Sequence, residues 1–475
     1  MTAEHQAHAT KGPPLIQPLG LRRRPDYKCF VENNISTPSG PSLSIEPSGS
    51  LPRVYVPHAT RHPNIFRRRI ARIEGRPGPG DWVAVYADPA VAAERLRRES
   101  SYNSYGGPPA HDEPPAQPRL FAYGLYNPKS EIAVRLLRWG ESLPDAAYWQ
   151  DRLRRAIALR HELLELPAGT DAYRLIHGEA DGFPGVVVDR YGDVLSAEVF
   201  SLGMLQRAVE LLRLLCEATG LPHYRIRVAP GFASQEGFEA DSVASAGCPA
   251  YVTVTENGTR YRIQFEGSHK TGFFCDQRDN RRQLAQWSKG RSVLDLCCYT
   301  GGFSVQAAAS GGAAEVTGVD IDDQPLAVAK KNANLNQVRV RFAQADVFAF
   351  MRDMLALGRT YDIVVLDPPK LIRSRQELEE GIRKHHDLNK LAMQLVAPRG
   401  LMLSCSCAGL LDQAAFDTML HAAARGARPA AIEGQPPGPP RMMQIVRRVG
   451  AAADHPVAVH CPETEYFRSV WLRLE

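Results

Sequence analysis

The sequence contains no long apolar run, no metal-ligand cysteine spacing and no strong excess of one charge. No apolar stretch approaches the ~18 residues of a membrane-spanning helix, so we expect no membrane segment. The first thirty residues include no continuous apolar stretch typical of a secretory signal. The nine cysteines form no C-x-x-C pair, so we expect free thiols, no metal site and a cytoplasmic protein. The net charge of +5 is only a mild indication of a polyanionic partner.

The 475 residues suffice for two to four domains, and changes in composition suggest where these lie. Residues 1–51 are rich in Pro, Ser, Gly and Asn, which predicts a disordered tail. Strand-like alternation around Gly and Pro turns predicts a small β-rich domain over 52–140, with an insertion at 88–118. Helical and strand patterns alternate irregularly over 141–265, which predicts an α+β middle domain.

The remaining part of the chain, residues 266–475, alternates strands with helices. Five apolar segments are strand candidates: VLDLC (293–297), EVTGVD (315–320), VRFAQAD (340–346), YDIVVLD (361–367) and GLMLSCSC (400–407). Strands separated by helical stretches are typical of a parallel, doubly wound sheet. The fold class we predict is therefore α/β, with a Rossmann-like sheet in the last domain.

A glycine turn follows the first of these strands. Ligands of such sheets bind at the carboxyl ends of the strands, where Gly301 and Gly302 permit close approach because they lack Cβ. By itself this is equally compatible with an ordinary tight turn, and the absence of G-x-G-x-x-G spacing argues against a dinucleotide. Asp320, nineteen residues after Gly301, can accept hydrogen bonds from ribose hydroxyls, and Asp346 is placed for an adenine amine. These residues favour a nucleoside without a phosphate to bind, a description that S-adenosylmethionine fits.

The fourth strand ends in Asp367-Pro368-Pro369-Lys370. The prolines fix the backbone and remove its N–H donors, which leaves the Asp367 carboxylate and nearby carbonyls available at the mouth of the site. An (Asp/Asn)-Pro-Pro element here is typical of methyltransferases that act on planar nitrogen or base substrates. A plain Pro-Pro turn is the alternative, which the upstream glycine turn and acids disfavour. We expect Pro368, Pro369 and Lys370 to contact the substrate.

Several long motifs resemble the large-subunit rRNA (cytosine-C5) methyltransferase I family. In the last domain these are HKTGFFCDQRDNR (269–281), YTGGFSV (299–305), LDPPK (366–370), SCAG (406–409) and ADHPV (453–457), and in the middle domain YRLIHGEADGFPGVVVDRYG (173–192). RHPNIF and LYNPKSEIAVR are similar to the family's amino-terminal RNA-binding domain of the PUA kind. The resemblance covers roughly 53–475, apart from the insertion.

The resemblance implies a class I S-adenosylmethionine-dependent methyltransferase that acts on large-subunit rRNA. The expected cofactor contacts are Gln277, Arg278, Asp295, Tyr299, Thr300, Gly301, Gly302, Phe303, Asp320, Asp346 and Asp367. In the family, the segment from His269 to Arg278 forms a lid over the cofactor; an ordinary polar helix start is the alternative. The sequence leaves open whether the protein is a homodimer.

Cytosine C5 becomes nucleophilic once a thiolate has added to C6. Register against the family places this nucleophile at Cys407, with Ala408 where the family usually has Ser. Cys405 lies on the same strand face, because side chains alternate, and is the second candidate. A buried apolar filler is the ordinary role of a strand cysteine. Asp367 is expected to hold the N3/N4 edge of the base, since no second cysteine follows the proline.

Two polar clusters remain. Arg61, Arg67, Arg68, Arg69, Arg72 and Arg76 accompany the single acid Glu74. Phosphate contacts would use such arginines, and the PUA-like resemblance favours RNA binding by Arg67, Arg68 and Arg69 over a solvated face. His385-His386-Asp387 is expected to be a solvated helix face, not a metal site.

Two other functions stay open. The same fold could methylate a guanine, for which no thiolate is needed. The chain could also be an RNA-binding assembly factor without catalysis, although acids at 320, 346 and 367 argue against this. A base that is methylated at C5 must be unstacked or flipped out, so the target must be single-stranded, looped or extruded.

Overall fold

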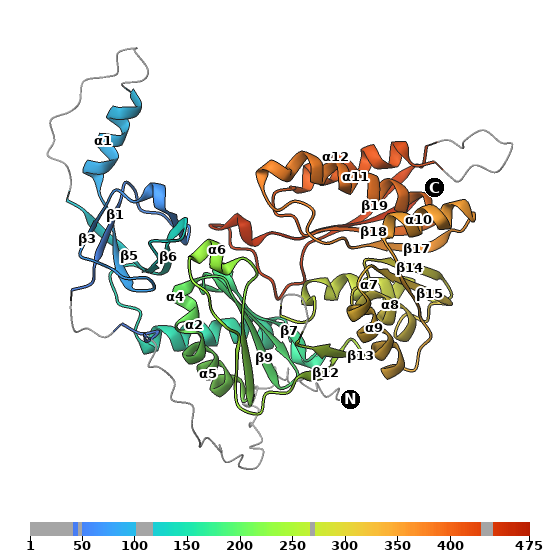
Figure 1. Cartoon of the computed structure of the whole chain (residues 1–475), viewed down its shortest axis with the longest axis horizontal. Coiled ribbons are helices and arrows are strands. Elements are labelled where there is room, and N and C mark those ends of the chain that lie inside the picture. The colour runs from blue at the N-terminus through green and yellow to red at the C-terminus, as the bar shows by residue number, and fades with distance from the viewer. Residues whose placement is uncertain (1–40, 46–49, 101–116, 267–270, 429–439) are drawn as a thin grey trace, which may run out of the picture. The chain divides into compact units, whose positions relative to one another are not determined.

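The computed structural model of the chain is drawn in Figure 1. It describes residues 41–45, 50–100, 117–266, 271–428 and 440–475. Most of the predicted tail, the greater part of the predicted insertion, and His269 and Lys270 lie outside the described residues. Among the helices that are described, none has both the length and the apolar character that crossing a membrane requires.

The first domain is built on a six-stranded sheet of order β2-β6-β5-β4-β1-β3. Its strands are β1 Arg53–Val56, β2 Asn64–Phe66, β3 Arg72–Glu74, β4 Trp82–Ala87, β5 Arg119–Tyr126 and β6 Ile132–Trp139. Alternating apolar residues such as Val54, Val83 and Val134 bury one core within it. One turn of 3-10 helix, η1 Arg67–Arg69, follows β2, and helix α1 Pro89–Ser100 occupies the first part of the predicted insertion.

The segment 41–45 differs from the prediction of a disordered tail. Leu43 is fully buried, and its carbonyl accepts a hydrogen bond from Trp149 Nε1 at 2.9 Å. The backbone N–H of Leu43 donates to the Glu210 carboxylate at 2.8 Å. Two apolar residues in a polar stretch give no periodicity, so composition alone could not identify this packed segment.

The middle domain contains a five-stranded sheet of order β11-β10-β9-β8-β7 and a hairpin, β12-β13. Its strands are β7 Ala172–His177, β8 Val186–Tyr191, β9 Val194–Val199, β10 His223–Val228, β11 Val243–Ala244, β12 Tyr251–Glu256 and β13 Thr259–Gln264. Its helices are α2 Ala146–Ala158, α3 Gly178–Asp181, α4 Leu202–Leu205, α5 Ala208–Thr219 and α6 Phe232–Glu236, with short turns η2 Leu159–Leu163 and η3 Leu166–Ala168. Trp82 and Tyr123 of the first domain share a core with Trp149 and Phe183, so these two domains pack together.

The last domain has a seven-stranded sheet of order β16-β15-β14-β17-β18-β20-β19. Its strands are β14 Ser292–Leu296, β15 Glu315–Asp320, β16 Arg341–Gln344, β17 Tyr361–Leu366, β18 Val396–Ser406, β19 Met443–Val449 and β20 Arg468–Leu474. The first five strands in this order are parallel, which confirms the predicted doubly wound α/β fold. β20 pairs antiparallel with β18, and β19 with β20.

Helices cover both faces of this sheet (Figure 1). They are α7 Arg278–Trp287, α8 Gly302–Ala309, α9 Asp323–Leu335, α10 Val347–Ala356, α11 Leu378–Gln394 and α12 Gln413–Gly426, with turns η4 Cys275–Gln277, η5 Arg375–Glu377 and η6 Pro462–Thr464. Residues of α10, α11 and α12 pack with Leu294, Leu366 and Met402. Residues of α7 and α8 pack with Val293, Val365 and Leu403, which project from the opposite face of the same strands. Alternate residues of each strand therefore face different helix layers.

Candidate active site

The turn between β14 and α8 has an unusual backbone. Cys297, Tyr299 and Gly301 have φ values of 63°, 50° and 77°, in the left-handed region that few non-glycine residues adopt. A Cβ on Gly301 would lie 3.1 Å from Ala329 Cβ and 3.2 Å from the Phe342 ring. Glycine is therefore required at this position by packing as well as by φ.

Asp320 fixes this turn to the end of β15. One carboxylate oxygen accepts the backbone N–H of Tyr299 at 2.8 Å, and the other accepts that of Asp322 at 3.1 Å. A carboxylate offers about four acceptor positions, so Asp320 retains capacity for two hydroxyl donors. This arrangement fits the expected contact with a ribose.

Asp295 lies beneath the turn and is fully buried. Its Oδ2 accepts hydrogen bonds from the backbone N–H of Ser304 at 2.9 Å and from the Ser304 hydroxyl at 2.5 Å. Its Oδ1 is buried and has no partner among the residues that the structure describes. Burial raises the pKa of Asp295 to about 7. A proton, or a donor on a ligand, would satisfy this oxygen.

The predicted acids converge on the thiol of Cys297, which sequence reasoning did not place in the site. Burial and then the negative charges of Asp320, Asp367, Asp295 and Asp346 raise the pKa of this cysteine. Acids from four neighbouring strands are therefore near enough to this thiol for their charges to act on it.

Asp346 is the most exposed of these acids. It is the N-cap of α10, and its Oδ1 accepts the backbone N–H of Ala349 at 3.0 Å. The adenine contact predicted for Asp346 would therefore use its other oxygen.

The Asp-Pro-Pro-Lys element leaves β17 at the same edge. The Asp367 backbone N–H donates to the Leu296 carbonyl at 3.3 Å, which keeps β17 against β14 up to this point. Asp367 is half-buried and Pro368 buried, whereas Pro369 and Lys370 are exposed. The polar end of this element is thus accessible to a large substrate.

The two candidate cysteines differ in accessibility. Cys405 is fully buried, and its sulfur accepts a hydrogen bond from Gln277 Nε2 at 3.4 Å. Burial and the charge of Asp367 raise the pKa of Cys405 well above the usual thiol range. Cys407 follows the last residue of β18, is half-exposed, and packs against the same side of the sheet as Cys405.

Gln277 and Arg278, both predicted cofactor contacts, are buried. The side-chain Oε1 of Gln277 accepts a hydrogen bond from Asn280 Nδ2 at 2.8 Å. Arg278 donates two hydrogen bonds to Asp454, at 3.0 and 2.6 Å. In the structure these residues fasten the start of α7, and their cofactor contacts remain a prediction.

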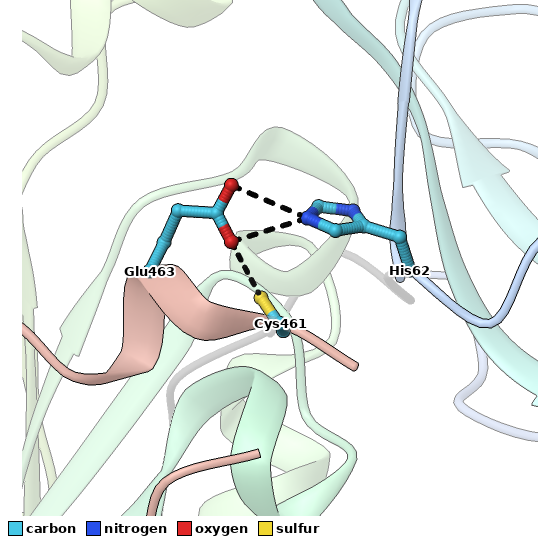
Figure 2. Close-up of side chains that lie close together, drawn as sticks. All are labelled: His62, Cys461 and Glu463. Atoms are coloured by element: carbon cyan, nitrogen blue, oxygen red, sulfur yellow. Dashed lines mark hydrogen bonds and ion pairs between the residues drawn. The ribbon is translucent and has the colours of Figure 1, made fainter. Parts of the chain in front are cut away.

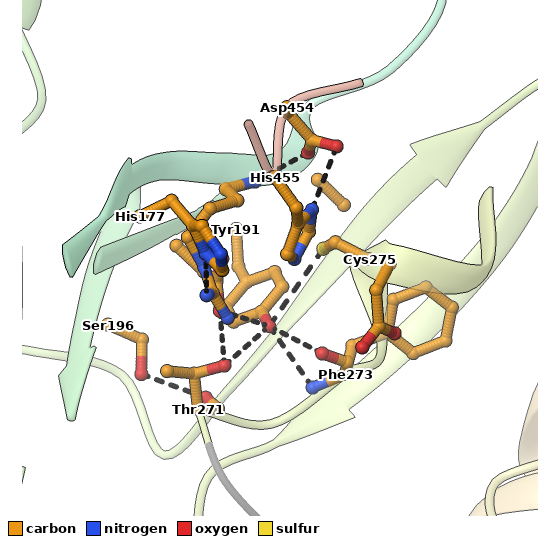
Figure 3. A network of polar contacts seen from close by, with 12 residues as sticks. His177, Tyr191, Ser196, Thr271, Phe273, Cys275, Asp454 and His455 are labelled. Atoms are coloured by element: carbon orange, nitrogen blue, oxygen red, sulfur yellow. Dashed lines mark hydrogen bonds and ion pairs between the residues drawn. The ribbon is translucent and has the colours of Figure 1, made fainter. Parts of the chain in front are cut away.

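The segment before α7 is tied to the middle domain by the buried polar network in Figure 3. The Tyr191 hydroxyl donates to the Phe273 carbonyl at 2.8 Å and lies 3.0 Å from the Thr271 hydroxyl. The Thr271 carbonyl accepts from the Ser196 hydroxyl at 2.8 Å. The described end of the predicted lid is therefore anchored through buried contacts.

The predicted RNA-binding arginines form η1 on the surface of the first domain. Arg67 donates to the Ser130 carbonyl at 3.0 Å, and the guanidinium of Arg68 lies 5.9 Å from the Phe66 ring centroid. Arg67 and Arg68 are exposed and Arg69 is half-exposed. Their charges therefore face solvent.

Two groups of side chains that include a histidine differ from what the sequence suggests. His385 is almost fully buried in α11, so the expected solvated helix face is wrong for this residue. His62, Cys461 and Glu463 lie close together (Figure 2). Their potential ligand atoms are within 4.8 Å of one another, and His62 Nε2 contacts the Glu463 carboxylate at 3.2 Å. Sequence spacing could not indicate this group, because 398 residues separate His62 from the next residue to join it, Cys461.

Comparisons with known proteins agree with this geometry. Residues 174–450 match the model of an S-adenosylmethionine-dependent methyltransferase family. Ribosomal RNA large subunit methyltransferase I of Photobacterium profundum is 33% identical over 86% of this chain and 94% of the relative, and that of Pseudoalteromonas atlantica is 34% identical with the same coverage.

Solved structures show the same fold. A methyltransferase crystallised with SAH, SMU.776, aligns with a TM-score of 0.67 at 18% identity, covering 87% of this chain and 96% of that one. A SAM-dependent methyltransferase from Streptococcus mutans aligns with a TM-score of 0.66, covering 89% and 99%. The predicted cofactor, S-adenosylmethionine, is thereby confirmed. The chain belongs to the S-adenosylmethionine-dependent methyltransferases, in the family that contains the ribosomal RNA large subunit methyltransferases I.

Proposed function

We propose that the protein methylates C5 of a cytosine in large-subunit rRNA, with Cys407 as the nucleophile. The observation that carries this proposal is the half-exposed Cys407 at the end of β18, beside the strand that ends in Asp367. The printed names of relatives 33% and 34% identical support large-subunit rRNA as the substrate.

S-adenosylmethionine supplies the methyl group when it is bound. Asp320 and the glycine turn would hold its nucleoside part, because Asp320 has acceptor positions left and Gly301 leaves the backbone accessible. The buried, unpartnered Oδ1 of Asp295 supports a polar ligand group beside this turn.

In the proposed reaction the Cys407 thiolate adds to C6, and the S–C6 bond forms as the ring electrons shift toward C5. C5 would then form a bond to the methyl carbon as the bond from that carbon to the cofactor's sulfur breaks. A base or solvent would take the C5 proton, the C5–H electrons would re-form the C5=C6 double bond, and the S–C6 bond would break to release the thiolate. Asp367 would orient the ring by accepting a hydrogen bond from the cytosine amino group.

The accessibility of the two cysteines favours Cys407 over Cys405. A nucleophile must come into contact with the base, and Cys405 is enclosed, bonded to Gln277 and disfavoured as a thiolate by burial. Cys407 has neither the full burial of Cys405 nor a place inside a strand.

We also propose that the first domain, which we infer to be PUA-like, contributes RNA affinity. The exposed arginines of η1 support this role, because phosphate contacts require accessible cations. A shared core joins this domain to the middle domain, so its removal would expose Trp149 and Phe183. Substitution of Arg68 and Arg69 is therefore a better test than truncation.

Base-resolution mapping of large-subunit rRNA tests the proposal. Protein-free rRNA from a strain that lacks the gene would be incubated with purified enzyme and labelled cofactor, and the modified nucleoside identified by mass spectrometry. We expect one 5-methylcytosine. A methylguanosine would support the alternative guanine reaction, and no label would support the non-catalytic alternative.

A further inference from the structure

Arg468, the first residue of β20, is a buried cation, and two of its guanidinium nitrogens have no partner among the described residues. Only 8% of its surface is exposed. Its Nε and Nη1 atoms are buried, and no described residue accepts a hydrogen bond from either. A buried guanidinium that lacks an acceptor is costly, and native structures seldom leave such donors unpaired without a functional reason.

Arg468 lies at the end of the sheet where the parallel strands have their carboxyl ends and where the proposed reaction takes place. β20 runs antiparallel to β18, and Arg468 pairs with Ser406, the last residue of β18. Cys407 is the next residue along the chain. The start of β20 therefore lies beside the proposed nucleophile, at the same edge as the ends of β15 and β17.

The side chain of Arg468 belongs to the helix layer of α11. Directly paired residues of antiparallel strands project from the same face, so Arg468 and Ser406 share a face. The Ser406 hydroxyl lies 3.3 Å from His385 Nε2 on α11. Cys405, by contrast, packs on the opposite face with Gln277.

His385 adds a second, independent observation. It is 1% exposed, and its Nδ1 also has no partner within the described part of the chain. Burial lowers the pKa of His385 to about 4, so the imidazole is neutral at physiological pH. Two buried side chains that flank Ser406 thus have unused hydrogen-bonding atoms.

The strand order separates this position from the expected cofactor contacts. Most of those contacts lie in or after β14, β15 and β16, and Asp367 follows β17, whereas Arg468 begins β20, beyond β18. Gln277 contacts Cys405 of β18, but on the face of the sheet opposite Arg468. We therefore expect the hydrogen-bond acceptor for Arg468 to come from the substrate that approaches Cys407 and Asp367, and not from the cofactor.

We propose that Arg468 binds the substrate by donating a hydrogen bond from its guanidinium to an oxygen of the target RNA nucleotide. This inference rests on the proposed placement of RNA at the ends of β17 and β18. The acceptor is a base carbonyl or a backbone phosphate; both are oxygen acceptors that suit a guanidinium.

Arg468→Met tests the inference, because methionine is apolar and flexible enough to fill the space. Arg473→Met is the matched control. Arg473 lies near the other end of the same strand, is partly exposed, and bonds Gln444 at 3.0 Å and Glu475 at 3.3 Å. For wild type and both variants, kcat and KM would be measured on protein-free large-subunit rRNA from the deletion strain, with cofactor affinity by calorimetry and Tm by calorimetric melting.

We expect Arg468→Met to lower kcat/KM about 10- to 150-fold, the loss of a charge-assisted hydrogen bond. Cofactor affinity should stay within about twofold, and Tm should be unchanged or higher because an unpaired buried charge is removed. A phosphate acceptor predicts a shallower salt dependence of RNA binding, by about 0.7 in the log–log slope. A base carbonyl predicts an unchanged slope with a lower kcat. Arg473→Met should match the wild type.

Two results would overturn the inference. One is a folded Arg468→Met variant with wild-type kcat/KM. The other is a variant with lower Tm and equally weakened cofactor binding, which would make Arg468 structural. Failure of the cytosine proposal is a separate outcome, since it would appear as a methylguanosine made by the wild type.

Discussion

The side-chain amide of Gln277 donates a hydrogen bond to the sulfur of Cys405 at 3.4 Å, inside the last domain. Both residues are at most 2% exposed. The contact joins the start of α7 to the middle of the sheet and involves the fully buried Cys405, whereas Cys407 is only partly buried. The pair thus separates the two cysteines that sequence alone leaves as alternatives.

Cys405→Ala should therefore retain methyl transfer. The substitution removes a buried sulfur and its hydrogen bond, so we expect a loss of about 1 kcal/mol in the free energy of unfolding with kcat within a few-fold of the wild type. Urea denaturation and steady-state kinetics measure the two quantities. Complete inactivity of a stably folded Cys405→Ala protein would show that Cys405, and not Cys407, is needed for the chemistry.

Asp320→Ala should weaken S-adenosylmethionine binding roughly 10- to 150-fold, because a charge-assisted hydrogen bond contributes about 1.5–3 kcal/mol. Calorimetric titration measures the change. Asp322→Ala is a suitable control, since Asp322 caps α9 by accepting the Gln324 N–H at 3.0 Å and should affect stability only. Equal affinities of the wild type and a folded Asp320→Ala protein would contradict the assigned ribose contact.

Asp295 should make stability depend on pH in the ligand-free protein. Burial in the folded state raises the pKa of Asp295 from its ordinary value near 4 to about 7, so the folded state binds the proton more tightly. This contribution is complete below pH 4 and is lost as the pH rises toward 7, at about 1.4 kcal/mol per pH unit. Asp295→Asn lacks the titration. The unfolding free energy of the wild type, relative to that of Asp295→Asn, should thus be lower at pH 8 than at pH 5. Urea denaturation measures both proteins at both pH values, and an equal difference at pH 5 and pH 8 would contradict the prediction.

Arg278 and Asp454 form a buried ion pair, with side chains 6% and 0% exposed. Burial opposes ionisation of Asp454, but His455 and Arg278 outweigh it and hold the pKa of Asp454 well below its usual value. Arg278→Met removes one of the two cationic partners of this carboxylate, together with two hydrogen bonds, and should cost about 3–5 kcal/mol of unfolding free energy.

The double variant Arg278→Met with Asp454→Leu should recover part of that loss, because no buried charge is then left unpaired. Arg154→Met provides the exposed comparison, since Arg154 is 77% exposed in its contact with Asp151 and should change stability by less than about 1 kcal/mol. Similar losses for the buried and the exposed arginine would show that burial does not set the strength of the pair.

The parallel sheet was predictable because each of its strands is a short apolar run that ends in a glycine turn or an acid. The acids at 320, 346 and 367 were predictable for the same reason, since the ends of parallel strands share one edge. Burial was not. His385 belongs to a polar triplet that looks solvated in the sequence, yet it faces the sheet and contacts Ser406.

Long-range partners were also beyond the reach of the sequence. Arg278 pairs with Asp454, 176 residues later, and no local spacing connects the two. Leu43 packs against Trp149 although its neighbours are polar. Such contacts depend on how separate domains and segments meet, and periodicity carries no information about that.

The most direct test of the central claim is covalent trapping on rRNA that contains 5-fluorocytosine. Fluorine replaces the C5 proton that must leave, so the S–C6 bond cannot be released and a denaturation-resistant protein–RNA adduct should accumulate. We predict this adduct in the wild type and in Cys405→Ala, and its absence in Cys407→Ala, which should still bind S-adenosylmethionine normally. An adduct that survives in Cys407→Ala, or no adduct with a wild-type enzyme that methylates ordinary rRNA, would contradict the proposed cytosine chemistry at Cys407.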